Sequence, residues 1–496
     1  MSTLLIRNGY ILDPLHDHGW VEDLRHSDIL INDGIISGVG SFAAETADST
    51  IEASGKLVIP GLISAHTHAT TTFDRALVDN CPLDPWMLYV VNASMSMTPR
   101  DTYVATALAA VELLESGTTA LFDLTSVSPA VFDEKVEAVV TAFQDVGIRA
   151  VVAPSVSDLP FSKTLPLHIV ADLTGLDHLD IRPLYDTAAW LDGCRGFLRR
   201  WHGKDPLTTC SLGLSGPHRC SPEVMEGVSE LVHQYQTGLQ THVYETKSQW
   251  IAAQRMFPRG MLRHMHEIGL LGPRTSLAHC VWLAEEDIDL IEETGTTVVH
   301  NPISNVRIGS GVAPVHKMRD KSIVVALGAD GPGSGDKANM FEVVKCAALI
   351  HKLYGPRETW LRAGESLNMC LAGGAAVLGQ PIGALRPGYR ADISILRMDH
   401  LFKMPKEHMI RQLAYSELGS SVETVLVDGR TVVSGGSVVT VDAAALHAEA
   451  QEIVSRIYAD LPRRDALFNA ADGLIGRMLA AVDGYKTPHD RLVQMK

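Results

Sequence analysis

The sequence has little that would suit an oxidising compartment or a membrane. Only 7 of its 496 residues are cysteines. They are scattered and form no CxxC pair, which predicts a reduced protein without a thiolate zinc site. No apolar run approaches the roughly 18 residues that span a bilayer, and the first residues lack the basic and then apolar pattern of a signal peptide. We therefore expect a cytoplasmic protein that does not bind membranes.

Positive charge is also in short supply. The chain carries 42 basic and 58 acidic residues, a formal net charge of −16. This balance argues against a nucleic-acid partner, because such proteins normally present a basic patch or stripe. Hydrophobic residues make up 46% and charged residues 20% of the chain, as in ordinary folded proteins. What the sequence does have is 21 histidines, and neutral imidazole is the commonest metal ligand.

Both ends of the chain are rich in short apolar strands. Residues 28–40 near the N-terminus and 422–436 near the C-terminus each contain two apolar runs around a turn signal, Asn32-Asp33-Gly34 in the first and Asp428-Gly429 in the second. Further short strands are predicted at 4–9 and 391–397. These segments predict β-structure at both termini.

Between these ends, apolar strands alternate with helical stretches. Eight strands are predicted, at residues 57–65, 118–124, 149–153, 210–214, 238–244, 275–278, 296–300 and 323–328. This alternation predicts an α/β fold with a parallel sheet, and eight is the number of strands that closes a (β/α)8 TIM-like barrel. An open doubly wound sheet is the alternative. Because one barrel takes about 250 residues, about half of the chain must form something else.

The first of these strands ends in two histidines, His66 and His68. Residues two apart on a strand point to the same face, and the carboxyl ends of barrel strands form the mouth that carries the active site. Taken alone, however, two histidines in this spacing could simply be polar residues at a strand end.

Other predicted strands also end in residues that can bind metals. His242 and Glu245 follow the fifth strand, His279 the sixth, His300 the seventh and Asp330 the eighth. Burying such groups without partners would cost several kcal/mol each, so a shared ion is the simplest explanation. Imidazoles with a carboxylate suit Zn²⁺, although Fe²⁺ and Mn²⁺ accept the same ligands.

These motifs, taken in order along the chain, resemble the amidohydrolase superfamily. Within it they are most similar to the S-adenosylhomocysteine/methylthioadenosine deaminases and s-triazine hydrolases. The resemblance spans nearly the whole chain and rests on His66-Thr67-His68, His242-Val243-Tyr244-Glu245-Thr246, Ala278-His279-Cys280, His300-Asn301-Pro302-Ile303-Ser304-Asn305, Ala329-Asp330-Gly331 and the segment 383–392.

The resemblance implies a domain organisation. Residues 1–56 and 384–440 would form a small composite β-sandwich built from both chain ends. Residues 57–383 would form the hydrolase barrel, and residues 441–496 a C-terminal helical extension. The family also suggests a homodimer or a larger homo-oligomer.

The resemblance further implies one divalent metal ion per chain, most simply Zn²⁺ with Fe²⁺ as the alternative. Its ligands would be His66, His68, His242 and Asp330. Relatives with two metal ions bridge them with a carboxylated lysine at the end of the fourth strand. Residues 210–218 contain no lysine, which predicts a mononuclear site.

The implied catalytic residues are Glu245, His279 and Asp330. Asp330 would take a proton from the metal-bound water, and the resulting hydroxide would attack the substrate. Glu245 would carry a proton to a ring nitrogen and then to the leaving group. His279 would stabilise the charge that develops on oxygen. The alternative is structural, with Glu245 facing solvent and His279 satisfied in the core. Candidate substrate-binding residues are His218, Trp86, Arg75 and Asn305.

We therefore expect an aminohydrolase that releases ammonia or an amine from a small nitrogen heteroaromatic substrate, such as a purine, a pyrimidine or an s-triazine. An alternative is hydrolysis of an amide, urea, carbamate or chloro-triazine bond at the same site. A scaffold that has lost its chemistry is a third possibility, but such proteins usually lose metal ligands, and all four candidates are present here.

Overall fold

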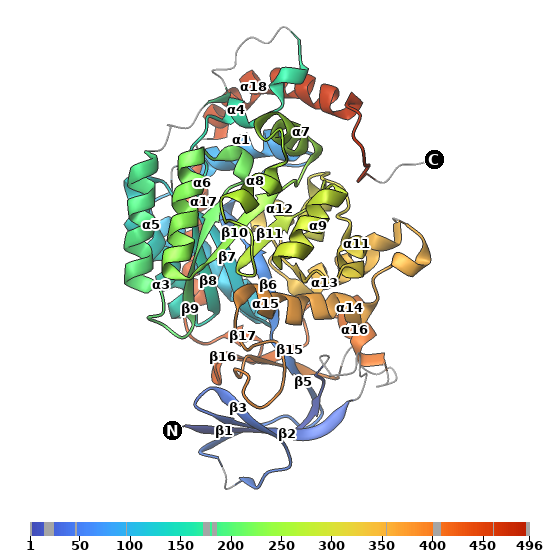
Figure 1. The fold of residues 1–496 in the computed structure, drawn as a ribbon. Coiled ribbons are helices and arrows are strands. Elements are labelled where there is room, and N and C mark those ends of the chain that lie inside the picture. Colours follow the sequence, from blue (N-terminus) through green and yellow to red (C-terminus); the bar gives the residue numbers. More distant parts are fainter. Residues whose placement is uncertain are drawn as a thin grey trace.

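The computed structural model describes residues 2–13, 24–44, 47–95, 97–171, 179–180, 186–353, 355–399, 408–459 and 461–492. Figure 1 shows a barrel surrounded by helices, with a separate sheet below it that contains the N-terminus. No helix within these ranges is long and apolar enough to cross a bilayer.

Eight parallel strands form the barrel sheet. They follow one another in chain order from β6 to β13, and each pairs with its sequence neighbour. Near the seam between the last strand and the first, the Asp330 N–H donates to the His66 carbonyl at 3.0 Å. The bounds are β6 (Leu62–Thr67), β7 (Thr118–Ser126), β8 (Arg149–Val156), β9 (Thr208–Leu214), β10 (Gly238–Val243), β11 (Thr275–His279), β12 (Thr297–His300) and β13 (Val325–Leu327). The predicted barrel is confirmed.

Helices surround this sheet and connect its strands. The longer ones are amphipathic and bury one face against the barrel strands, as α3 does with Val136, Val139 and Phe143. The helices of the first half are α1 (Leu83–Met95), α2 (Pro99–Glu115), α3 (Phe132–Val146), α4 (Phe161–Thr164), α5 (Thr187–Trp201), α6 (Pro222–Tyr235), α7 (Lys247–Met256) and α8 (Met261–Glu267). Those of the second half are α9 (Glu285–Thr294), α10 (Pro302–Arg307), α11 (Val315–Asp320), α12 (Pro332–Gly335), α13 (Met340–Ile350), α14 (Ala363–Asn368), α15 (Gly374–Leu378) and α16 (Met409–Tyr415).

Strands from both chain ends form the second sheet, which is mixed. Its order is β17-β16-β15-β14-β5-β1-β2-β3, with β4 paired to β1. Both predicted hairpin turns are present, and Asp33 and Asp428 adopt the positive φ that such turns require. The bounds are β1 (Thr3–Ile11), β2 (Arg25–Asn32), β3 (Ile35–Gly40), β4 (Ser49–Glu52), β5 (Lys56–Pro60), β14 (Ile393–Arg397), β15 (Val422–Val427), β16 (Arg430–Ser434) and β17 (Ser437–Val438).

The predicted strand at 57–65 is two strands in different sheets. β5 pairs with β1 and β14 of the mixed sheet, whereas β6 pairs with β7 of the barrel. The chain changes sheets at Gly61, where a Cβ would collide with the Thr119 side chain. The predicted domain boundary at residue 57 is therefore placed wrongly, because it falls inside β5. We propose the same two-domain division with the boundary at Gly61.

Two helices follow the mixed sheet, α17 (Ala443–Tyr458) and α18 (Leu461–Gly484). α17 packs against α2 on the side of the barrel. α18 crosses the opposite end of the molecule from the mixed sheet, beside α1 and α7 (Figure 1). The C-terminal extension thus reaches the helices that follow β6 and β10.

Candidate active site

Three histidines and an aspartate from different strand ends converge at the carboxyl end of the barrel. His66 and His68 lie at the end of β6, His242 on β10, and Asp330 just after β13. The Nε2 atoms of His68 and His242 are 3.0 Å apart. The Nε2 atoms of His66 and His68 lie 3.6 and 3.5 Å from Asp330 Oδ1. The four predicted metal ligands are therefore brought together.

The hydrogen bonds of these rings show which nitrogens carry protons. The Nδ1 atom of His66 lies 2.7 Å from Gln240 Oε1, that of His68 2.5 Å from the Leu124 carbonyl, and that of His242 2.7 Å from the Ser215 carbonyl. Each partner is an oxygen that only accepts, so each Nδ1 carries the hydrogen. In a neutral ring, Nε2 then presents a lone pair, as a metal ligand must.

The orientation of Gln240 is supported by its own bonds. Its amide nitrogen donates to the Ala65 carbonyl at 2.9 Å and to Ser276 Oγ at 3.0 Å, which leaves its oxygen to face His66. Gln240 lies two residues before His242 on the same strand, so its side chain shares that face of the sheet. This spacing was the signal that could have identified it from the sequence.

Three imidazole nitrogens and one carboxylate gathered in this way could hold a cation. His66 Nε2 is buried and has no hydrogen-bond partner. Burial, followed by repulsion from His68, lowers the pKa of His66 to about 3, and burial also lowers the pKa of His242. Both rings are thus neutral near pH 7, so they do not repel a cation. The residues fit a divalent metal ion that prefers nitrogen and oxygen ligands.

His279 and Glu245 complete the cluster. His279 lies between two carboxyl groups: its Nδ1 is 3.6 Å from Glu245 Oε1 and its Nε2 is 3.8 Å from Asp330 Oδ2. The Nδ1 atom is also 2.8 Å from Asn305 Oδ1. Glu245 is buried, and the Gln249 amide donates to its Oε2 at 3.3 Å. The alternative in which Glu245 faces solvent is therefore wrong.

The backbone at two of these positions is strained. His279 has φ = 71° and Asp330 has φ = 61°, in the left-handed region that side chains other than glycine rarely adopt. Strain of this kind persists only where the surrounding structure enforces it, and it is concentrated at functional sites. Here it turns both side chains toward the cluster.

A pocket opens above the cluster. The metal-site residues His68, His242 and Asp330 line it together with Glu245 and His279. Trp86, from α1, is the one predicted substrate contact that also lines it. The remaining lining residues are Thr70, Thr71, Leu83, Met87, Val90, Leu124, Ser126, Ser215, Arg219 and Ser334.

The other predicted substrate contacts lie elsewhere. Asn305 holds His279 by the bond described above and does not line this pocket. His218 is buried, its Nδ1 has no hydrogen-bond partner, and it too lies outside the lining. These two residues remain predictions as substrate contacts.

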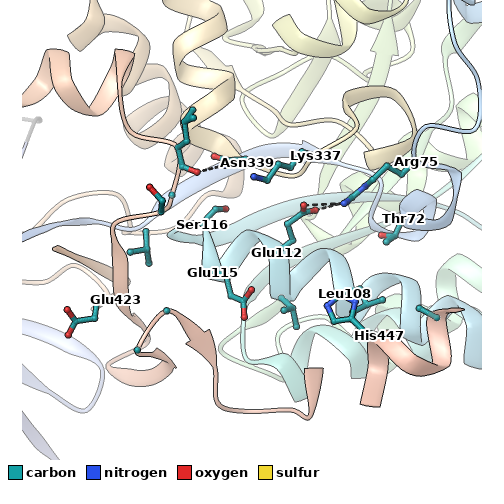
Figure 2. Close-up of a pocket in the computed structure, with 18 of the residues that line it drawn as sticks. Thr72, Arg75, Leu108, Glu112, Glu115, Ser116, Lys337, Asn339, Glu423 and His447 are labelled. Atoms are coloured by element: carbon teal, nitrogen blue, oxygen red, sulfur yellow. Dashed lines mark hydrogen bonds and ion pairs between the residues drawn. The ribbon is translucent and has the colours of Figure 1, made fainter. Parts of the chain in front are cut away.

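The structure does not bring Arg75 to the catalytic pocket. Arg75 lines a separate cavity of about 900 Å³ between α2, the mixed sheet and α17 (Figure 2). Glu112 on α2 accounts for this position, because its Oε2 lies 2.6 Å from Arg75 Nη2. The prediction that Arg75 contacts the substrate is therefore corrected.

Sequence reasoning also missed Arg219. It ends the short helix η6 (Pro217–Arg219) that follows β9, one residue after the predicted contact His218. An arginine in a loop after a barrel strand carries no distinctive pattern, so only the folded chain shows that it lines the catalytic pocket.

Comparison with known proteins agrees with this geometry. The model of the amidohydrolase family matches residues 57–432. The chain belongs to the amidohydrolase family. This amidohydrolase is 33% identical over 464 residues to the 5'-deoxyadenosine deaminase of Methanosarcina mazei, covering 92% of this chain and 100% of that protein. It is 32% identical over 462 residues to the 5-methylthioadenosine/S-adenosylhomocysteine deaminase of Desulforudis audaxviator, covering 92% and 99% of the two chains.

Solved structures share the fold of this amidohydrolase over almost their whole length. Atrazine chlorohydrolase TrzN from Arthrobacter aurescens, complexed with zinc, superposes with a TM-score of 0.81 at 25% identity, covering 91% of this chain and 100% of that one. An adenosine deaminase from Xanthomonas campestris with bound zinc gives a TM-score of 0.78 at 25% identity, covering 92% and 99%. The amidohydrolase is thus a hydrolase that acts on carbon–nitrogen bonds other than peptide bonds.

Proposed function

We propose that this amidohydrolase binds one divalent metal ion and releases ammonia or an amine from a nitrogen heteroaromatic substrate of the purine, pyrimidine or s-triazine type. The observation that carries the proposal is the set of three histidines whose Nδ1 hydrogens are all committed to oxygen acceptors, so that the Nε2 atoms of His66 and His68 face Asp330 and the Nε2 atom of His242 faces that of His68. The relatives described above, a 5'-deoxyadenosine deaminase and a 5-methylthioadenosine/S-adenosylhomocysteine deaminase, support the substrate class.

His66, His68, His242 and Asp330 would hold the ion, and zinc is the ion of the solved neighbours. Such an ion, when bound, lowers the pKa of a water molecule enough to make it a nucleophile near neutral pH. The fourth barrel strand and η6 contain no lysine that could bridge a second ion, which supports a single metal ion per chain. Fe²⁺ is the alternative occupant.

The protein's own groups would move the protons. Burial would raise the pKa of Asp330, but the rings of His66, His279 and His68 outweigh it and lower the pKa below its ordinary value, so Asp330 is ionised and accepts the proton of the attacking water. Burial raises the pKa of Glu245. Glu245 in its protonated form donates to a ring nitrogen, which makes the adjacent carbon electrophilic, and then passes a proton to the leaving amine.

His279 would stabilise the oxygen that develops charge. Its Nδ1 lies 2.8 Å from Asn305 Oδ1, which orients the ring so that Nε2 points toward Asp330 Oδ2 at 3.8 Å. A hydrogen-bond donor placed where negative charge develops lowers the activation barrier of the reaction, and it does so most strongly where water is excluded. His279 is buried, which meets this condition.

A release screen tests this function. We expect ammonia or amine from at least one member of a panel of aminopurines, adenosine derivatives, aminopyrimidines and aminotriazines, and about one equivalent of zinc or iron per chain by metal analysis. Glu245→Gln should abolish turnover and leave the metal content unchanged, because Glu245 is outside the proposed ligand set. Full activity of this variant would remove Glu245 from the mechanism, and a metal-free native protein would contradict the proposal.

A second candidate is hydrolysis of a chloro-triazine, amide, urea or carbamate bond at the same site. The fold similarity to an atrazine chlorohydrolase favours including it. Product analysis separates the candidates, since they release ammonia from a ring, an amine with a carbonyl compound, or chloride.

We further propose, from the family resemblance, a cytoplasmic homodimer or larger homo-oligomer. Light scattering coupled to gel filtration measures the oligomeric state directly, and a monomer of 53.7 kDa would contradict it.

A further inference from the structure

Arg219 is a buried arginine on the wall of the catalytic pocket. It is 5% exposed, and it lines the pocket beside Ser215, His242 and Glu245. The proposed reaction gives it no role. It shares this pocket with Glu245, which the proposed function makes the proton carrier.

The guanidinium of Arg219 has only two long hydrogen bonds to the protein among the described residues. Its Nη1 contacts Ser215 Oγ at 3.4 Å and Met87 Sδ at 3.8 Å, both weak interactions. Its Nε is buried without any hydrogen-bond partner. Across the described part of the chain, no carboxylate oxygen forms an ion pair with it.

A second buried arginine in the same chain shows the contrast. Arg149 is fully buried, and its Nε and Nη2 donate to the two oxygens of Asp392 at 2.7 and 2.9 Å. Its Nη1 donates to the Pro206 carbonyl at 2.8 Å. This is the usual state of a buried guanidinium, which is costly to bury unless its charge is paired and its donors are used. Arg219 departs from that state, because its Nε has no hydrogen-bond partner and no ion pair is formed with it in the described part of the chain.

Nearby carboxyl groups do not supply the missing charge. Glu245 and Asp84 are the acidic groups whose fields reach Arg219. Burial raises the pKa of both carboxyl groups, and within the described residues neither forms an ion pair with the guanidinium. Donors of Arg219 are therefore available to a group that enters the pocket.

We propose that Arg219 selects the substrate, by donating to an oxygen acceptor that the substrate carries, either a carbonyl oxygen on its ring or a carboxylate. The inference rests on the proposed function, since it deepens the identity of the substrate. The rigid fork of a guanidinium matches such oxygens with two parallel hydrogen bonds. A site built to hydrogen-bond an oxygen discriminates strongly against an analogue that lacks it, because the buried donor is then left unpaired.

Matched substrate pairs test the proposal. The pairs are cytosine and 4-aminopyrimidine, guanine and 2-aminopurine, and S-adenosylhomocysteine and 5'-methylthioadenosine. Within each of the first two pairs only one member carries a ring carbonyl, and in the third only one carries a carboxylate. We expect the native enzyme to prefer an oxygen-bearing member, and Arg219→Met to reduce that preference in kcat/KM by about 100-fold. The pair in which the preference collapses identifies the source of the oxygen.

Two further variants exclude a merely structural role. Arg219→Lys keeps the charge but not the fork, and it should restore part of the preference. Arg263→Met removes an exposed arginine from α8 and should leave the preference unchanged. Metal content and melting temperature report whether Arg219→Met still folds.

Failure of this inference can be told apart from failure of the proposed function. Equal loss of kcat/KM for both members of every pair, or an unchanged preference, overturns the role of Arg219 while the activity stands. No release from any substrate counts against the proposed function. In that case, calorimetry with xanthine, which carries ring carbonyl oxygens, and with purine, which carries none, decides the inference. Arg219→Met should weaken the binding of xanthine and leave the binding of purine unchanged. Unchanged binding of xanthine overturns the proposal.

Discussion

At the residue scale, the three histidines of the proposed metal site are each oriented by a hydrogen bond from the ring nitrogen that faces away from the cluster. Each of the three proposed ligand histidines is held through Nδ1 by an oxygen from another strand or loop of the barrel: the Gln240 side chain for His66 and main-chain carbonyls for His68 and His242. Only the first of these acceptors can be removed by substitution. Gln240 therefore offers a test of the site that leaves all four ligands in place.

Gln240→Leu should weaken metal binding without unfolding the protein. The change leaves the Nδ1–H of His66 without an acceptor and frees the ring to change tautomer. Loss of such a partner typically lowers metal affinity by about 10- to 100-fold, which competition with a chromogenic chelator measures. Gln254→Leu, at an exposed position on α7, is the matched control and should bind metal normally. Native affinity in Gln240→Leu would show that the orientation of His66 does not depend on this bond.

At the scale of elements, one aspartate joins two helices. Asp101 lies in the first turn of α2, where its Oδ2 accepts from the Thr98 N–H at 2.7 Å, while Thr98 Oγ1 accepts from the Asp101 N–H at 3.2 Å. Arg456 of α17 donates to the same carboxylate at 2.6 Å. The capping box thus also attaches the C-terminal extension to the barrel.

Asp101→Asn should lower the free energy of unfolding by about 1 kcal/mol at pH 7, the usual scale for a lost helix cap. Urea denaturation measures this loss. Asp133→Asn, at an exposed position in the first turn of α3, controls for the charge change. A loss of equal size in both variants would show that the cap and the contact with Arg456 contribute nothing specific.

The same carboxylate predicts a dependence on pH. Burial acts to raise the pKa of Asp101, but the bonds from Thr98 and Arg456 outweigh it and lower the pKa below the ordinary value. A lowered folded-state pKa gives stability that is fully present above the unfolded value, about 3.9, and is lost as the pH falls through the folded-state pKa. The difference between native protein and Asp101→Asn should therefore be constant from pH 7 to about 5 and shrink below about pH 4. A difference that grows on acidification would contradict this assignment.

At the scale of the whole molecule, a buried ion pair connects the barrel to the mixed sheet. Arg149 begins β8 in the barrel, and Asp392 lies just before β14 in the mixed sheet. Asp428, in the turn between β15 and β16, also contacts Arg149, with its Oδ1 3.2 Å from Nη2. Asp392 is the last residue of the segment 383–392. It is the main partner of Arg149, because it accepts two of the hydrogen bonds of the guanidinium.

Arg149→Met should destabilise the protein strongly, because it leaves the carboxylate of Asp392 buried without a counter-charge. Breaking a buried pair in this way costs about 3–5 kcal/mol, as urea denaturation would show. Arg200→Met breaks the exposed pair with Glu137 and should cost at most about 1 kcal/mol. Losses of similar size would mean that the connection between the two sheets is unimportant for stability.

The C-terminal tail reaches the loop that follows His279, the proposed catalytic histidine. Arg491 Nη2 donates to the Leu283 carbonyl at 2.7 Å, and His489 Nε2 lies 3.1 Å from the Trp282 carbonyl. Both acceptors follow His279 within four residues. Lys247, two residues after Glu245, also donates to the Asp483 carbonyl of α18 at 3.1 Å. The tail thus supports the backbone that positions both catalytic side chains.

Replacing both His489 and Arg491 by alanine should therefore lower kcat by about 10-fold and leave the metal content unchanged, because small displacements of catalytic groups slow the reaction. Steady-state kinetics with metal analysis measures both. Native kcat in the double variant would make the tail a purely structural extension.

Much of the barrel and of the proposed metal site could be predicted from the sequence, because the features that indicate them lie within short segments of the chain. Strand side chains alternate with a period of two, which places His66 and His68 on one face, and parallel strands bring their carboxyl ends to one mouth. The same period accounts for Gln240 beside His242. Hairpin turns were equally visible, since Asp33-Gly34 and Asp428-Gly429 adopt conformations that few other residue pairs tolerate.

Only the tertiary structure decided features that depend on partners distant in the chain. An apolar run does not show that it changes sheets at Gly61, because β5 and β6 are equally buried in different sheets. Glu112 holds Arg75 in another cavity, whereas Arg219 lines the candidate active-site pocket and forms no ion pair within the described residues. The chemistry of a charged side chain is local, but whether its charge is already paired depends on the whole fold. That distinction separates a structural arginine from one that is available to a substrate.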